Sequence, residues 1–346
     1  MSRLCRQQKG ENMGNATIIA VDTGNKLMKT QNFVFSAGVK DHMGRMPATL
    51  EDIEVLQYQK HFYTVSEQHI PNIANKTEDA RYTVLTLFGV AKELNLNGTE
   101  QYRGADGVVR TSIILALGLP ISHYEKYKGE YTRFYRNGGV PFVFSYKPQG
   151  GKMTKYEITV DRVYVFPQGF AACQSSPEVQ RICRDGTTYV VDIGGYTTDI
   201  VRLRDGRPDP DFAKTFNRKG FNDLAAKIND RVQDMVGEAL LDYQIDRILS
   251  EDGAREKIPQ RVTALVQETA RTYGRDFLTS ILENSDMNIA LATVVFVGGG
   301  SLRLRPYITE AIKARGGAGA VKWIPELKAN AIGYYALTAA MEKRRK

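Results

Sequence analysis

TYVVDIGGYTTDIVRL, residues 188–203, is an apolar run, a turn that contains two glycines, and a second run that is again apolar. Short apolar runs that end in turns are typical of buried strands, and two runs this close together predict a hairpin. Asp192 ends the first strand, and Gly194 follows in the turn. Glycine after a strand-end aspartate lets the backbone fold sharply, so that its N–H groups can face an anion.

The same arrangement occurs near the start of the chain. TIIAVDTGN, residues 17–25, is also an apolar run that ends in Asp-x-Gly, and a second run at 32–36 follows at hairpin distance. One such hairpin could arise by chance, but two in a chain of 346 residues indicate a repeat. We therefore predict an α/β fold of two duplicated domains with a cleft between the copies.

The rest of the chain alternates between helix and strand patterns. Apolar positions three or four residues apart predict helices at 78–94, 221–250, 259–284 and 330–341. Strands are predicted at 60–65, 140–145, 156–166 and 293–297. The apolar segment 112–119 fits either a helix or a buried strand, and 38–104 is otherwise polar and irregular.

Composition excludes several classes of protein. Hydrophobic residues make up 42% and charged residues 25%, which is typical of a globular chain rather than a disordered one. No apolar run approaches the ~20 residues of a bilayer span, and the first residues lack the apolar core of a secretory signal. The three cysteines show no CxxC spacing, which argues against a disulfide framework or a cysteine zinc site. We expect a soluble, cytoplasmic protein that does not contact the membrane.

The net charge of +8 is concentrated at the two ends, within residues 1–14 and 341–346. A dedicated nucleic-acid reader would instead line one face with lysine and arginine. We therefore expect flexible basic ends, with residues 1–14 as an N-terminal extension. Contact of these ends with an acidic surface or polymer is the alternative.

The second turn has the groups that hold phosphate. The amides around Gly194 and Gly195 and the hydroxyls of Thr197 and Thr198 could bind terminal phosphates. The alternative is that the turn only closes a hairpin, which explains one such turn better than it explains two.

Charged residues beside the turns suit a metal ion and a phosphate chain. Asp22 and Asp192, brought face to face, could hold Mg²⁺ largely through water, because that ion dehydrates reluctantly. Lys26 or Lys29 could offset phosphate charge, and the sequence does not separate the two.

Two further features are ambiguous when taken alone. Gly298–Gly300 follows a predicted strand and would allow the close approach of a nucleoside, although a plain strand-to-helix turn is the alternative. Gln168 follows another strand, and its neutral amide could orient a water for attack on a γ-phosphate. As an isolated residue, it would be an ordinary loop position.

These motifs together resemble the actin/heat-shock-chaperone/sugar-kinase superfamily, and most closely the bacterial actin-like ATPases of the ParM/StbA plasmid-segregation type. Val21–Asn25 is similar to the first phosphate motif of the family, Asp192–Asp199 to the second, and Val297–Gly300 to the adenosine motif.

Three further stretches match the connecting regions of the same family. Gly118–Pro120 resembles a Gly-Leu-Pro sequence of ParM-like chains, and Val165–Gly169 resembles their first connecting segment. Ala329–Gly333 resembles the second connecting helix. The resemblance covers about residues 15–340. It implies an actin-like, ribonuclease H-like fold with a smaller subdomain in each domain.

The resemblance also implies a site for ATP or GTP with Mg²⁺. Asp22 and Asp192 would organise the metal and the attacking water, and Gln168 would position that water. The implied nucleotide-binding residues are Thr23, Gly24, Asn25, Lys29, Gly194, Gly195, Tyr196, Thr197, Asp199, Gly220, Gly298, Gly299 and Gly300.

The function that the resemblance implies is a filament that segregates plasmid DNA. The chain would polymerise with itself and contact DNA indirectly, through an adaptor of the ParR type. The chain is too short for the peptide-binding domain of a heat-shock chaperone. A small-molecule kinase, a non-polymerising ATPase of the same fold and a cell-shape actin homologue are the alternatives.

The expected domains follow from the same comparison. Domain I would cover 15–185, with a small subdomain at about 38–104, and domain II would cover 186–346, with one at about 220–290. The last helix would pack back towards domain I. Within domain I, the segment 38–80 is our candidate for one side of the filament contact.

Overall fold

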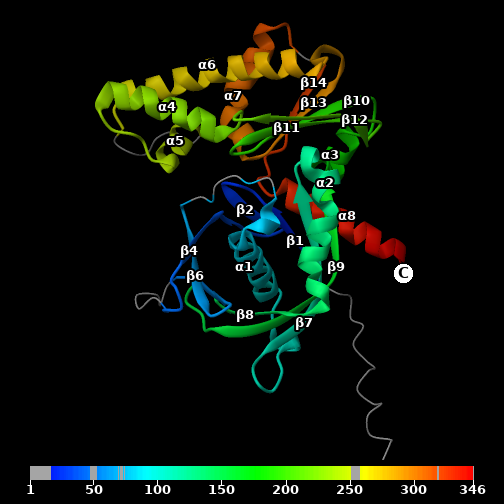
Figure 1. The fold of residues 1–346 in the computed structure, drawn as a ribbon. Helices are drawn as coiled ribbons and strands as arrows, with labels where there is room; N and C mark the ends of the chain where they lie inside the picture. Colours follow the sequence, from blue (N-terminus) through cyan, green and yellow to red (C-terminus); the bar gives the residue numbers. More distant parts are fainter. Residues whose placement is uncertain are drawn as a thin grey trace, which may run out of the picture.

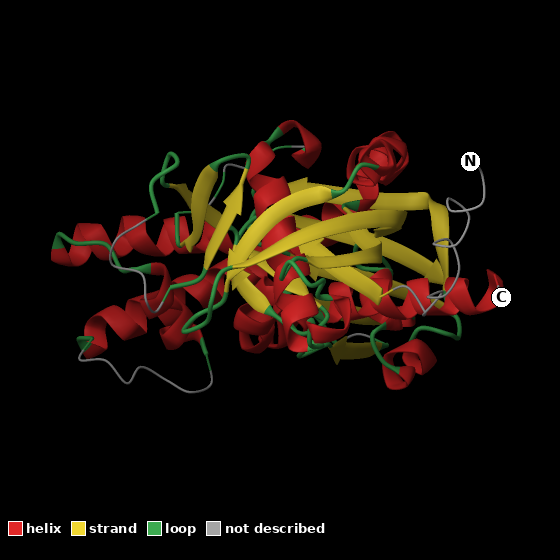
Figure 2. Cartoon of the chain, turned by 90° about the horizontal axis from the view of Figure 1, so that it is seen from below, coloured by secondary structure: helices red, strands yellow, loops and turns green. Residues whose placement is uncertain are grey.

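A computed structural model describes residues 17–46, 53–68, 70, 73, 75–250, 258–317 and 319–345 of the chain. Its strands form a nine-stranded and a five-stranded sheet, which lie in separate lobes (Figure 1). We call residues 17–167 the first lobe and residues 187–323 the second lobe. Helices lie on both sides of the strands when the chain is seen from below (Figure 2). The predicted extension, residues 1–14, lies outside the described residues.

The sheet of the first lobe has the strand order β3-β2-β1-β7-β9-β8-β5-β6-β4. Its strands are β1 (Thr17–Thr23), β2 (Leu27–Thr30), β3 (Val34–Ser36), β4 (Gly38–Asp41), β5 (Val55–Tyr58), β6 (His61–Ser66), β7 (Val109–Leu119), β8 (Phe142–Lys147) and β9 (Thr154–Pro167). β1, β7 and β9 are parallel, so their carboxyl ends meet at one edge. In open α/β sheets, ligands bind at such an edge.

Two helices complete the first lobe, α1 (Ala80–Leu96) and α2 (Ile121–Arg136). α1 begins after Asp79, whose side chain accepts a hydrogen bond from the backbone N–H of Arg81 and caps the helix. It packs on β1 and β2 with Leu85 and Phe88 fully buried, so the predicted helix at 78–94 is confirmed.

The sheet of the second lobe has the order β12-β11-β10-β13-β14. Its strands are β10 (Thr187–Ile193), β11 (Thr197–Arg204), β12 (Arg207–Asn217), β13 (Thr293–Val297) and β14 (Ala320–Trp323). Two antiparallel pairs followed by two parallel pairs repeat the pattern of β3-β2-β1-β7-β9 in the first lobe. The predicted duplication is therefore present in the strand order.

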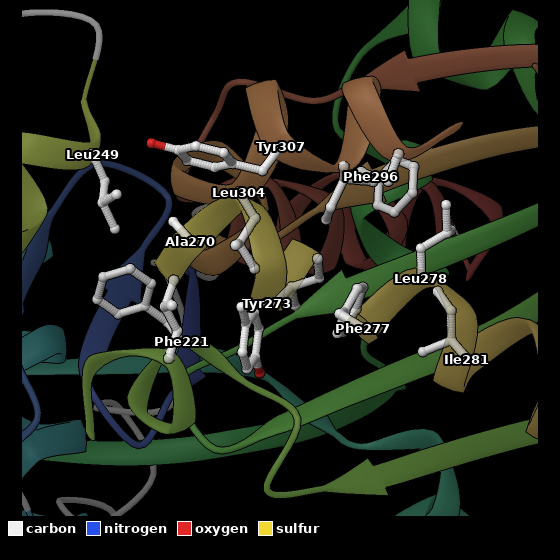
Figure 3. Packing of buried hydrophobic residues seen from close by; sticks show 14 of the residues in the cluster. Phe221, Leu249, Ala270, Tyr273, Phe277, Leu278, Ile281, Phe296, Leu304 and Tyr307 are labelled. Atoms are coloured by element: carbon white, nitrogen blue, oxygen red, sulfur yellow. The ribbon is translucent and has the colours of Figure 1, made fainter. Parts of the chain in front are cut away.

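The helices of the second lobe pack around one apolar core. They are α4 (Phe221–Val236), α5 (Asp242–Leu249), α6 (Gln260–Ser285) and α7 (Gly299–Ala314). Figure 3 shows Tyr273 and Phe277 of α6 in this core with Phe221 of α4 and Leu304 of α7. The core fixes α4 and α7, whose first turns lie next to the second glycine turn.

The last helix, α8 (Ala329–Arg345), returns to the first lobe and packs on β1 and β7. It also packs on a short 3₁₀ helix, η4 (Ala171–Gln174), which lies between the two sheets in the sequence and precedes α3 (Pro177–Ile182). A Cβ on Gly333 would lie 1.7 Å from the carbonyl oxygen of Ala171, so this contact requires glycine. The basic residues 343–345 belong to the last turn of α8, which corrects the expectation of a flexible C-terminal end.

The structure also resolves or corrects other local predictions. The ambiguous segment 112–119 is a strand, and the helical stretch 221–250 is two helices, α4 and α5. α2 was not predicted, because its many tyrosines and Gly129 weaken the helical pattern; burial of Tyr131 and Tyr135, four residues apart, stabilises it. Within the described residues, no helix has both the length and the apolarity of a membrane span.

Candidate functional site

A cleft between the two lobes brings most of the predicted site residues together. It lies where β1, β7 and β9 of the first lobe and β10 and β13 of the second lobe end. Predicted residues that line it are Asp22, Thr23, Gly24, Asn25, Lys29, Gln168, Asp192, Gly194, Gly195, Thr197, Asp199, Gly298, Gly299 and Gly300. Residues distant in sequence thus share one concave site, which is the usual form of a ligand pocket.

The first turn holds a buried ion pair. Asp22 is 1% exposed, and the antiparallel pairing of β1 with β2 places Lys29 directly opposite it. The Lys29 ammonium lies 2.9 Å from Asp22 Oδ2. Burial lowers the pKa of Lys29, but the charge and hydrogen bond of Asp22 outweigh this effect and leave the pKa above its ordinary value. Lys29 therefore stays charged in the cleft.

Lys26 also lines the cleft, but its partners belong to the second lobe. Its ammonium is 3.1 Å from Asp242 on α5 and 4.7 Å from the ring centre of Phe221 on α4. The two lysines that the sequence could not separate therefore have different surroundings: Lys29 pairs within the first lobe, and Lys26 connects the lobes.

Gln168 follows β9 and points at the other oxygen of Asp22. Its Nε2 donates a 2.8 Å hydrogen bond to Asp22 Oδ1, while its backbone N–H donates to the carbonyl of Leu119. The strand β9 thus ends with the amide held beside the carboxylate. The predicted neighbours Asp22 and Gln168 do meet; the role of Gln168 towards water stays a prediction.

In the second turn, Asp192 is held by a residue of α8. Nδ2 of Asn330 donates a 2.8 Å hydrogen bond to Asp192 Oδ2, in a buried position. Burial and the nearby charge of Asp22 raise the pKa of Asp192, whereas the Asn330 hydrogen bond and Lys29 oppose the rise. Two carboxylates that share one lysine favour a further cation, so the residues present suit a divalent ion.

Gly298 brings the start of α7 against this carboxylate. Its φ is +89°, and a Cβ there would lie 2.4 Å from Asp192 Oδ1. β13 ends at Val297 and α7 begins at Gly299, so the segment is a strand-to-helix turn that also lines the cleft. The backbone N–H groups at the N-terminus of α7 provide a local positive potential there.

Asp199 lies deeper, on β11. Thr215 Oγ1 is 2.6 Å from Asp199 Oδ1, and Thr197 Oγ1 donates a 3.3 Å bond to Oδ2. Burial raises the pKa of Asp199 to about 7, although these two hydrogen bonds lower it. Thr215 Oγ1 also lies 2.8 Å from Ser122 Oγ on α2, which is a further contact between the lobes.

Tyr196 and Gly220 are not among the described residues that line the cleft. Gly220 supports the second turn from behind: the N–H groups of Phe221 and Asn222 donate to the carbonyls of Gly194 and Gly195. A Cβ on Gly220 would lie 2.4 Å from the Gly195 carbonyl oxygen. The assignment of both residues to nucleotide binding stays a prediction.

Lys76 and Asn330 are cleft residues whose polar side chains were not predicted to belong to the site. Lys76, in a 3₁₀ turn before α1, is buried and donates to the carbonyl of Thr23, and burial lowers its pKa to about 8. It lies in the irregular segment, where the sequence offers no signal. Asn330 lies within the motif Ala329–Gly333, and the resemblance of that motif to the second connecting helix was the available signal.

Solved structures resemble the chain over nearly its whole length. The actin-like protein Alp7A has a TM-score of 0.70 at 15% identity, over 95% of this chain and 97% of that one. The chain has the actin-like fold. A ParM filament structure from Clostridium botulinum has a TM-score of 0.67 at 18% identity, over 94% and 100% of the two chains.

Further comparisons agree with this actin-like fold. An archaeal actin homologue in complex with ADP has a TM-score of 0.64 at 16% identity, over 93% of this chain and 99% of that one. The family model of the Alp7A C-terminal domain matches residues 187–322, which is the second lobe almost to its ends. No curated protein matches in sequence. The resemblance to ParM-type actin-like proteins, inferred from the motifs, is confirmed.

Proposed function

We propose that this chain is an actin-like ATPase that polymerises in a nucleotide-dependent manner into filaments. The observation that carries the proposal is the meeting of both Asp-x-Gly turns and Gly298–Gly300 in one cleft between the lobes. A ligand held by both turns would favour one relative position of the lobes over others. The site would therefore act as a switch.

The residues present fit a nucleoside triphosphate, ATP or GTP, together with Mg²⁺. Asp22 and Asp192 would hold the ion, largely through water, and Lys29 would offset phosphate charge. When bound, Mg²⁺ would neutralise charge on the phosphates. Gly24, Gly194 and Gly298 line the cleft, and their backbone would face the ligand. The ADP complex of the archaeal homologue supports nucleotide binding at a site of this fold.

The roles of the side chains in hydrolysis follow from where they lie. Gln168 donates to Asp22 through Nε2, which leaves its Oε1 as an acceptor for a water proton. We propose that Gln168 orients the attacking water. Asp22 and Asp192 would fix charges around the reacting phosphate, because phosphoryl transfer is accelerated mainly by positioning and charge stabilisation.

Filament formation rests on comparison with the ParM and Alp12 filament structures, which have this fold. Subunits that repeat head to tail use a heterologous contact, which gives an open polymer when its rotation does not close a ring. We propose that the filament acts in the cytoplasm and segregates plasmid DNA through a separate ParR-type adaptor. We further propose a division into domains near residue 186, which the separate sheets support.

Sedimentation and phosphate release with Mg²⁺–ATP and Mg²⁺–GTP would test the proposal together. We expect pelleting above a critical concentration and release of phosphate. Asp192→Ala should lower turnover by about 100-fold or more, since charge organisation at the phosphate is lost. Asp276→Ala, at an exposed carboxylate on α6, is the matched control and should behave as wild type. A protein that stays monomeric at about tens of micromolar with ATP and with GTP would refute polymerisation and favour a small-molecule kinase.

A further inference from the structure

The side chain of Asn330 forms hydrogen bonds to both halves of the cleft. Its Oδ1 accepts a 2.9 Å hydrogen bond from the backbone N–H of Gly169, and its Nδ2 donates a 2.8 Å bond to Asp192 Oδ2. The residue is 7% exposed. The amide orientation is fixed by chemistry, because an N–H needs the carbonyl oxygen and a carboxylate needs the NH₂ group.

The backbone group that Asn330 binds belongs to the residue after Gln168. Gln168 in turn donates to Asp22, which pairs with Lys29. A continuous series of bonds therefore runs from Lys29 in the first lobe, through Gln168 and Asn330, to Asp192 in the second lobe. Asn330 is its only member on α8.

α8 itself is fixed to the first lobe. Near its end, Glu342 accepts a 2.6 Å hydrogen bond from Tyr164 and lies 3.0 Å from Arg162, both on β9. The same strand ends at Pro167, directly before Gln168. Consequently, the position of Asn330 depends on the first lobe, whereas the carboxylate it holds belongs to the second.

We propose that Asn330 is a positioning residue that sets Asp192 in register with Gln168 for hydrolysis. The inference rests on the proposed ATPase function. Asn330 contacts Asp192, which would hold the metal, and the backbone N–H of Gly169, which follows the water-positioning Gln168 in the chain. It acts only through these two neighbours. Its amide supplies both bonds with one rigid group, so a displacement of one partner is passed to the other.

Two variants separate the two bonds. Asn330→Ala removes both. Asn330→Asp keeps an acceptor for the Gly169 N–H but replaces the donor to Asp192 with a second carboxylate. Asn284→Ala, at an exposed asparagine near the end of α6, is the control for loss of an amide.

The first measurement uses the nucleotide-free protein. Hydrogen exchange at the Gly169 amide should quicken in Asn330→Ala and remain slow in Asn330→Asp, because only the first variant lacks an acceptor for that N–H. Unchanged exchange in Asn330→Ala would overturn the bond to Gly169 on which the inference depends.

The second measurement is phosphate release with separate determination of nucleotide affinity. In both variants we expect kcat to fall by about 10–100-fold, as for residues that orient metal ligands, with the Kd for nucleotide changed less than about threefold. Wild-type kcat in either variant would overturn the positioning role. So would a loss of affinity as large as the loss of kcat, because that pattern marks a structural residue; if Asn330→Ala does not fold, Asn330→Asp decides alone.

The wild-type protein separates the two hypotheses. If it releases no phosphate, the proposed ATPase function fails and the positioning role fails with it. If it releases phosphate and the Asn330 variants match it, the positioning role alone is wrong.

Discussion

Replacement of Gly298 by alanine tests how closely the start of α7 must approach the second turn. Gly298 has φ +89° and ψ 160°, a region almost restricted to glycine, where another residue costs about 1–3 kcal/mol. The added Cβ would also lie 2.4 Å from Asp192 Oδ1 and 2.5 Å from the Ile193 carbonyl oxygen. Relief of that overlap costs about 1–3 kcal/mol more.

We therefore expect Gly298→Ala to lower the free energy of unfolding of the second lobe by about 2–6 kcal/mol. Nucleotide affinity should fall as well, because Asp192 must move away from the new methyl group. Gly316→Ala is the control: its φ is +92°, and no described atom lies within 4 Å of the added Cβ. It should cost only the backbone strain, about 1–2 kcal/mol.

Urea unfolding followed by tryptophan fluorescence suits this comparison. Trp323 is the single tryptophan of the chain and stacks on Phe296 in the second lobe, with ring centres 4.2 Å apart. Its emission therefore reports on the lobe that contains both glycines. Calorimetric titration with ADP would give the affinity. Equal unfolding free energies and equal affinities for the two alanine variants would refute the steric argument.

Three further predictions concern hydrolysis, pH and assembly. Gln168→Ala should slow phosphate release while nucleotide binding persists, so that filaments last longer after a nucleotide pulse; failure to bind nucleotide would contradict the role in water positioning. Burial raises the pKa of Asp199 from 3.8 to about 7, so the folded state binds the extra proton and stability falls as pH rises between these values. Asp199→Asn should remove that slope, worth at most about 4 kcal/mol, and identical pH profiles of urea midpoints would contradict the assignment. Lys40→Glu with Arg45→Glu, both exposed in the segment 38–80, should raise the critical concentration for pelleting without altering ADP affinity; an unchanged critical concentration would exclude these positions from the contact.

The parts of the fold that could be predicted from the sequence are those with a local pattern. The second strand–turn hairpin, α1, α6 and β13 each have periodicity and boundary residues within a short window, and the structure contains them. The first hairpin was predicted with the wrong second strand: β1 pairs with β2, and the predicted run at 32–36 contains β3, which pairs with β2 instead. The residues of the turns line the cleft because parallel strands end at a common edge.

The unpredicted parts depend on contacts between distant segments. Asn330 and Asp192 are separated by 138 positions, and no local pattern shows that α8 places an amide against that carboxylate. Lys76 lies in a polar, irregular segment, and its burial follows only from the packing of α1 and α2 around it. The choice between Lys26 and Lys29 likewise required the strand register that sets Lys29 opposite Asp22.

The packing of Gly333 on Ala171 has a mechanical consequence. The chain passes from one lobe to the other twice, after β9 and before α8, and these two passages lie in contact because Gly333 has no side chain. Two adjacent attachment points resist sliding and shear but permit rotation about the line that joins them. Relative motion of the lobes should then be a hinge rotation, in which displacements grow with distance from the axis. Small-angle scattering with and without nucleotide would show a change in radius of gyration for such a rotation, whereas an unchanged profile would contradict it.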